Sequence, residues 1–76
     1  MKLDIKYKFD DEVYVVYKED DVVRIFKGKI VEFSMSKDYG LHYYVDNSGD
    51  DYVEQELIAV DRDDLLIERI NKLLEE

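Results

Sequence analysis

The chain has 76 residues, with 20 acidic against 11 basic side chains and a net charge of −9. This length predicts a single domain (1–76) with a thin core, since such a chain buries only roughly 60 % of its unfolded surface. The absence of cysteine excludes disulfides and thiolate chemistry. No apolar run approaches the ~20 residues of a membrane span, and Asp4 stands where a signal peptide would be apolar. We therefore expect a cytoplasmic protein without membrane contact.

The acidic excess also narrows the choice of partner. Nucleic-acid binding draws much of its affinity from basic side chains that replace counterions on the phosphates. The sequence has a single small basic cluster, formed by Lys2, Lys6 and Lys8, and Asp4 lies within that cluster. The charge favours solubility or an acidic surface that contacts a basic protein, and it disfavours nucleic acid.

The first two predicted elements are strands. Over residues 2–9 charged residues alternate with the apolar Leu3, Ile5, Tyr7 and Phe9, which predicts a half-buried strand. Val13–Tyr17 is β-branched and aromatic throughout, which predicts a second strand. Charged turns are expected at 10–12 and 18–21.

Residues 22–36 read as one long strand with a single interruption. Val23, Ile25 and Phe26 precede Gly28, and apolar residues alternate with polar ones after it. An isolated glycine within a strand pattern favours a bulge or a sharp bend. We expect Gly28 to be that corner, with a loop at 36–40 after the strand.

Residues 41–45 and 51–55 predict a hairpin. The loop between them suits a type I turn at Asn47-Ser48 with Gly49 in the left-handed region. This loop would place Asp46 opposite Asp50. The register then sets Tyr44 opposite Tyr52, Tyr43 opposite Val53 and His42 opposite Glu54. Leu41, Tyr43, Val45 and Val53 should face the core, leaving His42, Tyr44, Tyr52 and Glu54 on the outer face.

A tight turn at 55–57 and a short strand at 58–60 lead into the last predicted element, a helix. Asp61 is a natural N-cap, and Asp63 and Asp64 fall in the first turn, where the helix dipole favours acids. An apolar stripe recurs at helical spacing in Leu66, Ile67, Ile70, Leu73 and Leu74. The stripe predicts docking on the strands, or on another chain if it stays exposed.

These elements predict a mainly β fold, a small SH3-like barrel of about five or six antiparallel strands (1–60) with one C-terminal α-helix (61–76). The runs that carry a resemblance are 9–16, 27–31, 43–45 and 52–54. In them the chain resembles the small SH3-like (Tudor-like) barrels, many of which are uncharacterised proteins of phages and prophages of low-GC Gram-positive bacteria. Asp10-Asp11 replaces the Gly-Asp pair usual in that family. The resemblance implies a non-catalytic module whose partner is unknown.

Catalytic and metal sites have little support in the sequence. His42 opposite Glu54 could form an acid–base pair, but we expect a surface histidine in a polar cross-strand pair, because no nucleophile has an activating context. The acid clusters at 10–12, 19–21 and 46–51 supply the oxygen ligands that Ca²⁺ or Mg²⁺ prefers. With Gly49 at the EF-hand glycine position, however, the closing acid would fall on Gln55. We expect turn residues there, no enzyme and no cofactor.

The aromatic residues are the strongest functional lead, because tyrosine suits interfaces. Tyr44 and Tyr52 would form an exposed platform flanked by His42 and Glu54, which predicts protein binding. Tyr17, Tyr39 and Tyr43 could instead form a cation-binding cage, or the rings pad the core. Two further alternatives are an acidic mimic of nucleic acid that blocks a DNA-binding protein, and a nucleic-acid-binding barrel that uses Lys2, Lys6, Lys8, Lys27 and Lys29. The oligomeric state is left open.

Overall fold

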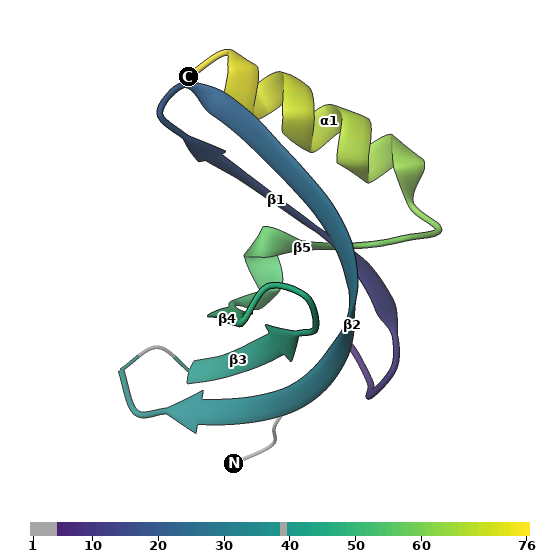
Figure 1. Ribbon diagram of the computed structural model, residues 1–76. Coiled ribbons are helices and arrows are strands. Elements are labelled where there is room, and N and C mark those ends of the chain that lie inside the picture. The colour runs from purple at the N-terminus through teal and green to yellow at the C-terminus, as the bar shows by residue number, and fades with distance from the viewer. Residues whose placement is uncertain (1–4, 39) are drawn as a thin grey trace.

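The computed structural model describes residues 5–38 and 40–76 of the chain. Within them lie five strands and one α-helix. The strands form one antiparallel sheet of order β4-β3-β2-β1-β5 (Figure 1). The strands are β1 (Glu12–Glu19), β2 (Val22–Ser36), β3 (Gly40–Val45), β4 (Asp50–Tyr52) and β5 (Leu57–Ala59). A 3-10 helix, η1 (Glu54–Glu56), precedes β5, and α1 (Asp63–Leu74) closes the fold. The predicted mainly β fold with a C-terminal helix is confirmed.

The β1–β2 hairpin has a two-residue turn made of acids. Asp20 and Asp21 both have positive φ, 51° for Asp20 and 66° for Asp21. Two consecutive residues with positive φ define the type I′ turn, whose twist matches that of the flanking strands. The predicted charged turn is therefore present, and it sets Glu19 opposite Val22.

Strand β2 belongs to both halves of the curved sheet. Its first half pairs with β1 and its second half pairs with β3 (Figure 1). The bounds of this long strand match the prediction, but the bulge does not lie at Gly28. The register shifts between Ile30 and Glu32, so Val31 is the extra residue, whereas Gly28 pairs regularly with Val13.

Gly28 is needed for a different reason, the close approach of the β3 end. A Cβ at this position would lie 2.5 Å from Val45 Cγ1 and 2.7 Å from the backbone oxygen of Asp46. Such distances are shorter than real Cβ contacts, so only glycine fits beneath this segment.

The register of the β3–β4 hairpin differs from the prediction by one residue. Val45 pairs with Asp50, Tyr44 with Asp51 and Tyr43 with Tyr52. Asp46 leaves the ladder to β4 because its backbone N–H donates to the Lys29 oxygen (2.9 Å) and its Oδ1 accepts from the Lys29 N–H (2.6 Å). Since side chains alternate between the faces, this slip places Tyr44 and Tyr52 on opposite faces of the hairpin.

The predicted N-terminal strand is wrong over its described part, since residues 5–8 form no strand; residues 2–4 lie outside the described residues. The backbone there bonds to side chains instead of a ladder: the Lys6 N–H donates to the Tyr43 hydroxyl (3.2 Å), and the Lys8 N–H donates to Asp11 Oδ2 (2.9 Å). Tyr7 is buried, whereas Ile5 and Phe9 are exposed.

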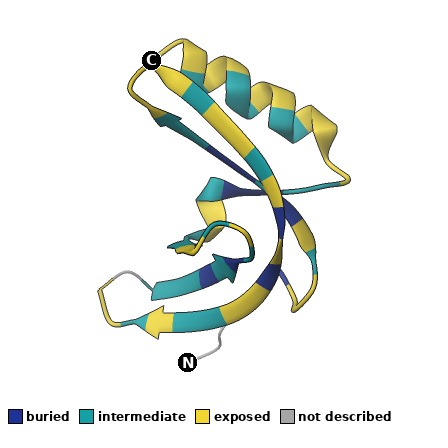
Figure 2. Cartoon of the chain, in the orientation of Figure 1, coloured by how far each residue is buried: buried dark blue, intermediate teal, exposed yellow. Residues whose placement is uncertain are grey.

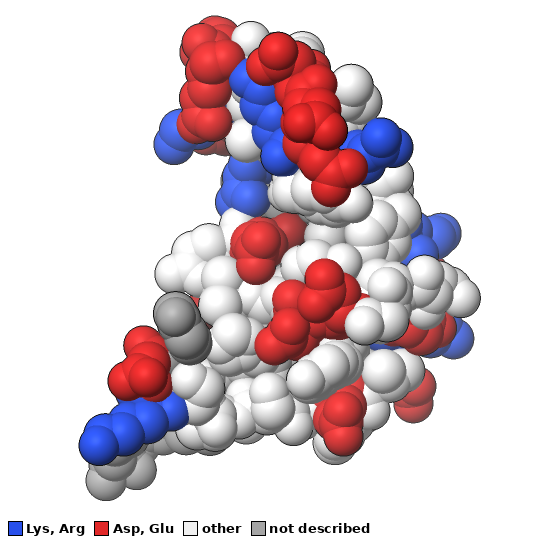
Figure 3. Space-filling view, turned by 60° about the vertical axis from the view of Figure 1, so that its left-hand side comes forward, with Lys and Arg blue, Asp and Glu red and all other residues white. Residues whose placement is uncertain are grey.

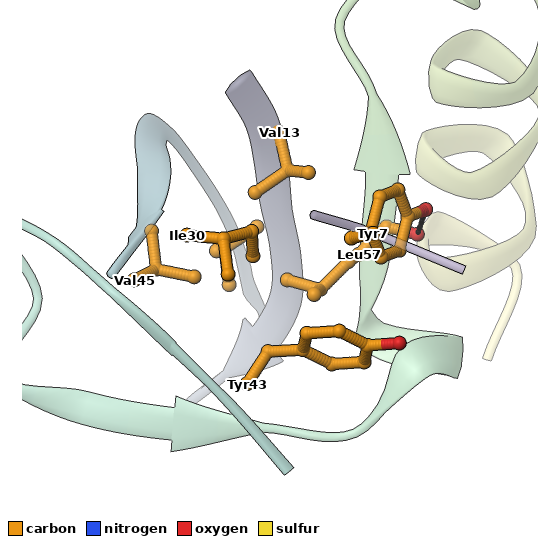
Figure 4. Packing of buried hydrophobic residues seen from close by; sticks show 7 residues of the cluster. Tyr7, Val13, Ile30, Tyr43, Val45 and Leu57 are labelled. Carbon is orange, nitrogen blue, oxygen red and sulfur yellow. Dashed lines mark hydrogen bonds between the residues drawn. The ribbon is translucent and has the colours of Figure 1, made fainter. Parts of the chain in front are cut away.

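The core lies inside the curve of the sheet (Figure 4). Its buried residues are Tyr7, Val13, Val15, Ile30, Tyr43, Val45 and Leu57. The Tyr7 and Tyr43 rings meet edge to face, with centroids 5.4 Å apart. Tyr43 and Val45 face the core as predicted, and Leu41 packs at its margin. Tyr52, rather than the predicted Val53, supplies the packing from β4.

Helix α1 lies along the β1–β2 hairpin and packs more closely on β1 than on β2. Arg62, not the predicted Asp61, is its N-cap, and Asp63 and Asp64 occupy its first turn as expected. Of the predicted stripe, Leu66, Ile70 and Leu73 are half-buried, while Ile67 and Leu74 remain exposed (Figure 2). The stripe therefore docks within the chain only in part. No helix among the described residues has the length and apolar character needed to cross a membrane.

Candidate functional site

The four residues of the predicted binding surface do not form one site. His42 and Tyr44 lie on one face of the β3–β4 hairpin, and Tyr52 lies on the other, opposite Tyr43. Glu54 is in η1, beyond the end of β4. The predicted Tyr44–Tyr52 and His42–Glu54 pairs are therefore wrong, while a role of any of these residues in partner binding stays a prediction.

His42 has an acidic partner, but a different one. Its Nδ1 lies 2.8 Å from Oδ2 of Asp51. In the ladder Asp51 pairs with Tyr44, two residues along β3 from His42. The His42 side chain is 17 % exposed and that of Asp51 34 % exposed, so both are largely covered. The arrangement joins β3 to the short edge strand β4, which is a structural role.

Tyr52 contributes to a groove on the opposite face, of about 380 Å³. The residues lining it come from the end of β1, from β4 and from η1: Tyr17, Lys18, Glu19, Asp50, Asp51, Tyr52 and Glu56. Tyr17 and Tyr52 are half-buried and pack on the margin of the core. Phe26 supports Tyr52 from β2, with ring centroids 6.1 Å apart. We refer to this site as the tyrosine groove.

The sequence places these groove residues together for identifiable reasons. Residues at alternate positions of a strand share a face, so Val15, Tyr17 and Glu19 continue the core face of β1 toward the turn. The core ends at Val15, and Tyr17 and Glu19 extend past it toward solvent. Near the tight β1–β2 turn and the short β4 strand, both rings remain half-buried.

The electrostatics of the groove are acidic. Burial raises the pKa of the Tyr52 phenol above its ordinary value, a hydrogen bond with Ser48 opposes this, and the nearby Asp50, Tyr17 and Glu56 raise it further. Lys18 is the one cation of the lining, and its Nζ is held by the Glu76 backbone oxygen at 2.7 Å. In Figure 3, acidic side chains gather in the middle of the face shown, with few basic ones among them.

The predicted cation cage is not assembled as expected. Tyr43 is only 1 % exposed and Tyr39 lies outside the described residues. Tyr17 instead lines the groove together with Tyr52. Sequence reasoning missed this pair because it depends on the hairpin register; the alternation of β1 was the one signal that pointed to Tyr17.

The acid clusters have structural roles. Asp11 and Asp46 accept backbone N–H groups, and Asp20 and Asp21 form the hairpin turn. Within residues 5–38 and 40–76, no group of three or more His, Asp or Glu side chains is arranged to hold a metal ion.

Comparison of the chain with protein-family models, with curated proteins and with solved structures gave no match. The groove must therefore be interpreted from its own geometry and charge.

Proposed function

We propose that the chain is a non-catalytic interaction module whose tyrosine groove binds a basic segment of another protein. The observation that carries the proposal is the combination of two half-exposed rings, Tyr17 and Tyr52, with acids in the same groove. An aromatic face attracts a cation, and the attraction increases when the cation is partly removed from water. A lysine or arginine side chain fits both parts of this lining.

The charges around the groove favour the same class of partner. Asp50 of β4 is exposed, and the groove lining also includes Glu19 from β1 and Glu56 from η1. Oε1 of Glu19 already lies 3.4 Å from Nε of Arg24 on the neighbouring strand, but both side chains are more than half exposed. Such a surface pair contributes only about 0–1 kcal/mol, so an incoming cation can replace it.

The proposal is tested by titrating lysine-rich and arginine-rich octapeptides into the labelled protein and following backbone amide shifts by NMR. We expect the shifts to centre on β4 and on the end of β1. A glutamate-rich octapeptide should cause no such shifts. Because the contact is electrostatic, affinity should fall as salt increases.

Three substitutions remove three of the four acidic charges of the groove lining while keeping the side-chain shapes: Glu19→Gln, Asp50→Asn and Glu56→Gln. The matched control changes the net charge equally on the helix side of the molecule: Asp61→Asn, Glu68→Gln and Glu75→Gln. We expect the groove variant to weaken binding by about tenfold or more, about 1.4 kcal/mol. Equal losses in both variants would show that overall charge, not the groove, attracts the peptide.

A second control concerns the rings. Tyr17→Leu should weaken binding, whereas Tyr44→Leu, on a strand outside the groove, should not. If the two variants behave alike, the groove is not the binding site. The SH3-like resemblance implies a non-catalytic module of unknown partner and stays a prediction, as do the nucleic-acid alternatives.

A further inference from the structure

The first half of β2 has one edge paired with β1 and one edge that no described strand covers. β3 begins its pairing with β2 only at Ile30, where Val45 is opposite, and Asp46 bonds to Lys29 just before it. From Val22 to Lys27, β2 pairs with β1 alone. Figure 1 shows this part of the strand rising beyond β3 as one side of a two-stranded ribbon.

The direction of the backbone groups follows from bonds at the end of this segment. Ile30 exchanges bonds with Asp10 and Asp11 on the β1 side, whereas Lys29 exchanges them with Asp46 on the other side. Successive residues of a strand alternate in this direction. The N–H and C=O groups of Val23, Ile25 and Lys27 therefore point outward from the uncovered edge.

This edge carries exposed apolar side chains together with two basic ones, each of which lies near an acid on β1. Val22 is 49 % exposed and Ile25 44 % exposed. Nζ of Lys27 lies 3.6 Å from Oε2 of Glu12 on β1, and Arg24 forms a similar ion pair with Glu19. On a molecule of net charge −9, this segment is a neutral, β-branched edge. Such an edge is a template for another strand.

We propose that this edge pairs with the same edge of a second copy of the chain, through an antiparallel two-fold centred on Ile25. In that register Ile25 lies opposite Ile25, Val23 opposite Lys27 and Arg24 opposite Phe26, so no like charges are directly opposed. A shift centred on Arg24 would oppose two guanidinium groups, which is unfavourable. The two β1–β2 ribbons then form one four-stranded sheet.

A second copy suits this edge because the edge is self-complementary in that register: Ile25 meets Ile25, and Arg24 and Lys27 each lie opposite an apolar residue. The remaining acids oppose the approach of two copies at long range. Salt screens that repulsion, so dimerisation should strengthen as salt increases. This is the reverse of the salt response expected for basic peptides in the tyrosine groove.

The test is sedimentation velocity over a wide concentration range, at low and high salt. We expect a monomer–dimer equilibrium for the unaltered chain. Ile25→Lys should weaken dimerisation by about tenfold or more, because two ammonium groups then face each other across the two-fold. Ile67→Lys makes the same change at a more exposed apolar residue of α1 and should leave the equilibrium unchanged.

A cross-linking experiment tests the register independently of the lysine variant. The chain has no cysteine, so Ile25→Cys and Ile67→Cys each introduce a single thiol. Opposed residues of such a pair have Cα atoms about 5.5 Å apart, within the range that a disulfide spans. Mild oxidation should therefore couple two Ile25→Cys chains much faster than two Ile67→Cys chains. A chain that stays monomeric at millimolar concentration, or equal coupling of both variants, would overturn the proposal.

Discussion

Replacement of Gly28 by alanine should destabilise the protein, because the space above this residue is filled. The added Cβ would lie 2.5 Å from Val45 Cγ1 and 2.7 Å from the Asp46 oxygen. The Asp46 backbone cannot withdraw freely, since its N–H donates to the Lys29 oxygen and its side chain accepts from the Lys29 N–H. Relief of the clash therefore displaces the end of β3 or breaks one of these bonds.

The expected cost follows from these contacts. Forcing extra volume into a packed site costs about 1–3 kcal/mol, and the loss of one hydrogen bond adds about 1 kcal/mol. The better strand preference of alanine over glycine offsets about 0.5–1 kcal/mol. The net loss of unfolding free energy is about 2 kcal/mol, a large part of the ~4–11 kcal/mol expected for a chain of this length.

Urea unfolding followed by far-ultraviolet circular dichroism measures this loss. Gly49→Ala is the matched control, because Gly49 has φ +69° but no atom beyond its own and the two adjoining residues lies within 4 Å of its Cβ position. Its cost should come from the backbone alone, about 1 kcal/mol. If Gly28→Ala costs no more than Gly49→Ala, the close approach does not constrain the fold and the reasoning fails.

Two further variants test other parts of the fold. Tyr7→Phe removes the hydroxyl that donates to the Leu57 oxygen (3.3 Å), so the urea midpoint should fall by an amount that corresponds to about 1 kcal/mol; an unchanged midpoint would contradict this role. Burial, with a contribution from Glu54, raises the pKa of Tyr7 above its ordinary value of 10.0. Its stabilisation is therefore complete below pH 10 and is lost as the pH rises above 10, and Tyr7→Phe should flatten that decline in urea midpoints. Asp20→Asn with Asp21→Gly should stabilise the hairpin by about 1 kcal/mol, because Asn-Gly favours the positive φ values of this turn; a lower midpoint would refute it.

The sequence was a good guide where local pattern and long-range packing agree. β2 has the predicted bounds, and the alternation in 41–45 correctly placed Tyr43 and Val45 toward the core. A strand with one buried face has only one register that buries its apolar side chains. The apolar pattern alone therefore determines which residues of these strands face the core.

The candidate site was harder to predict because it depends on a single-residue choice of register. The bonds between Asp46 and Lys29, distant in sequence, remove Asp46 from the hairpin ladder and shift every pair after it. No local signal in 46–50 indicates this. The N-terminal segment failed similarly: its alternation is that of a strand, but Tyr43 and Asp11 side chains take up its backbone N–H groups.

The position of β5 beside β1 has a consequence for how the chain acquires its fold. The β1–β2 and β3–β4 hairpins join neighbours in sequence, whereas β5 must return to pair with β1 from the other end of the sheet. Closing that long loop carries an entropic cost that only the finished pairing offsets. We therefore expect the meander of β1 to β4 to form early, and the docking of β5 and of the helix that follows it to be the slower step.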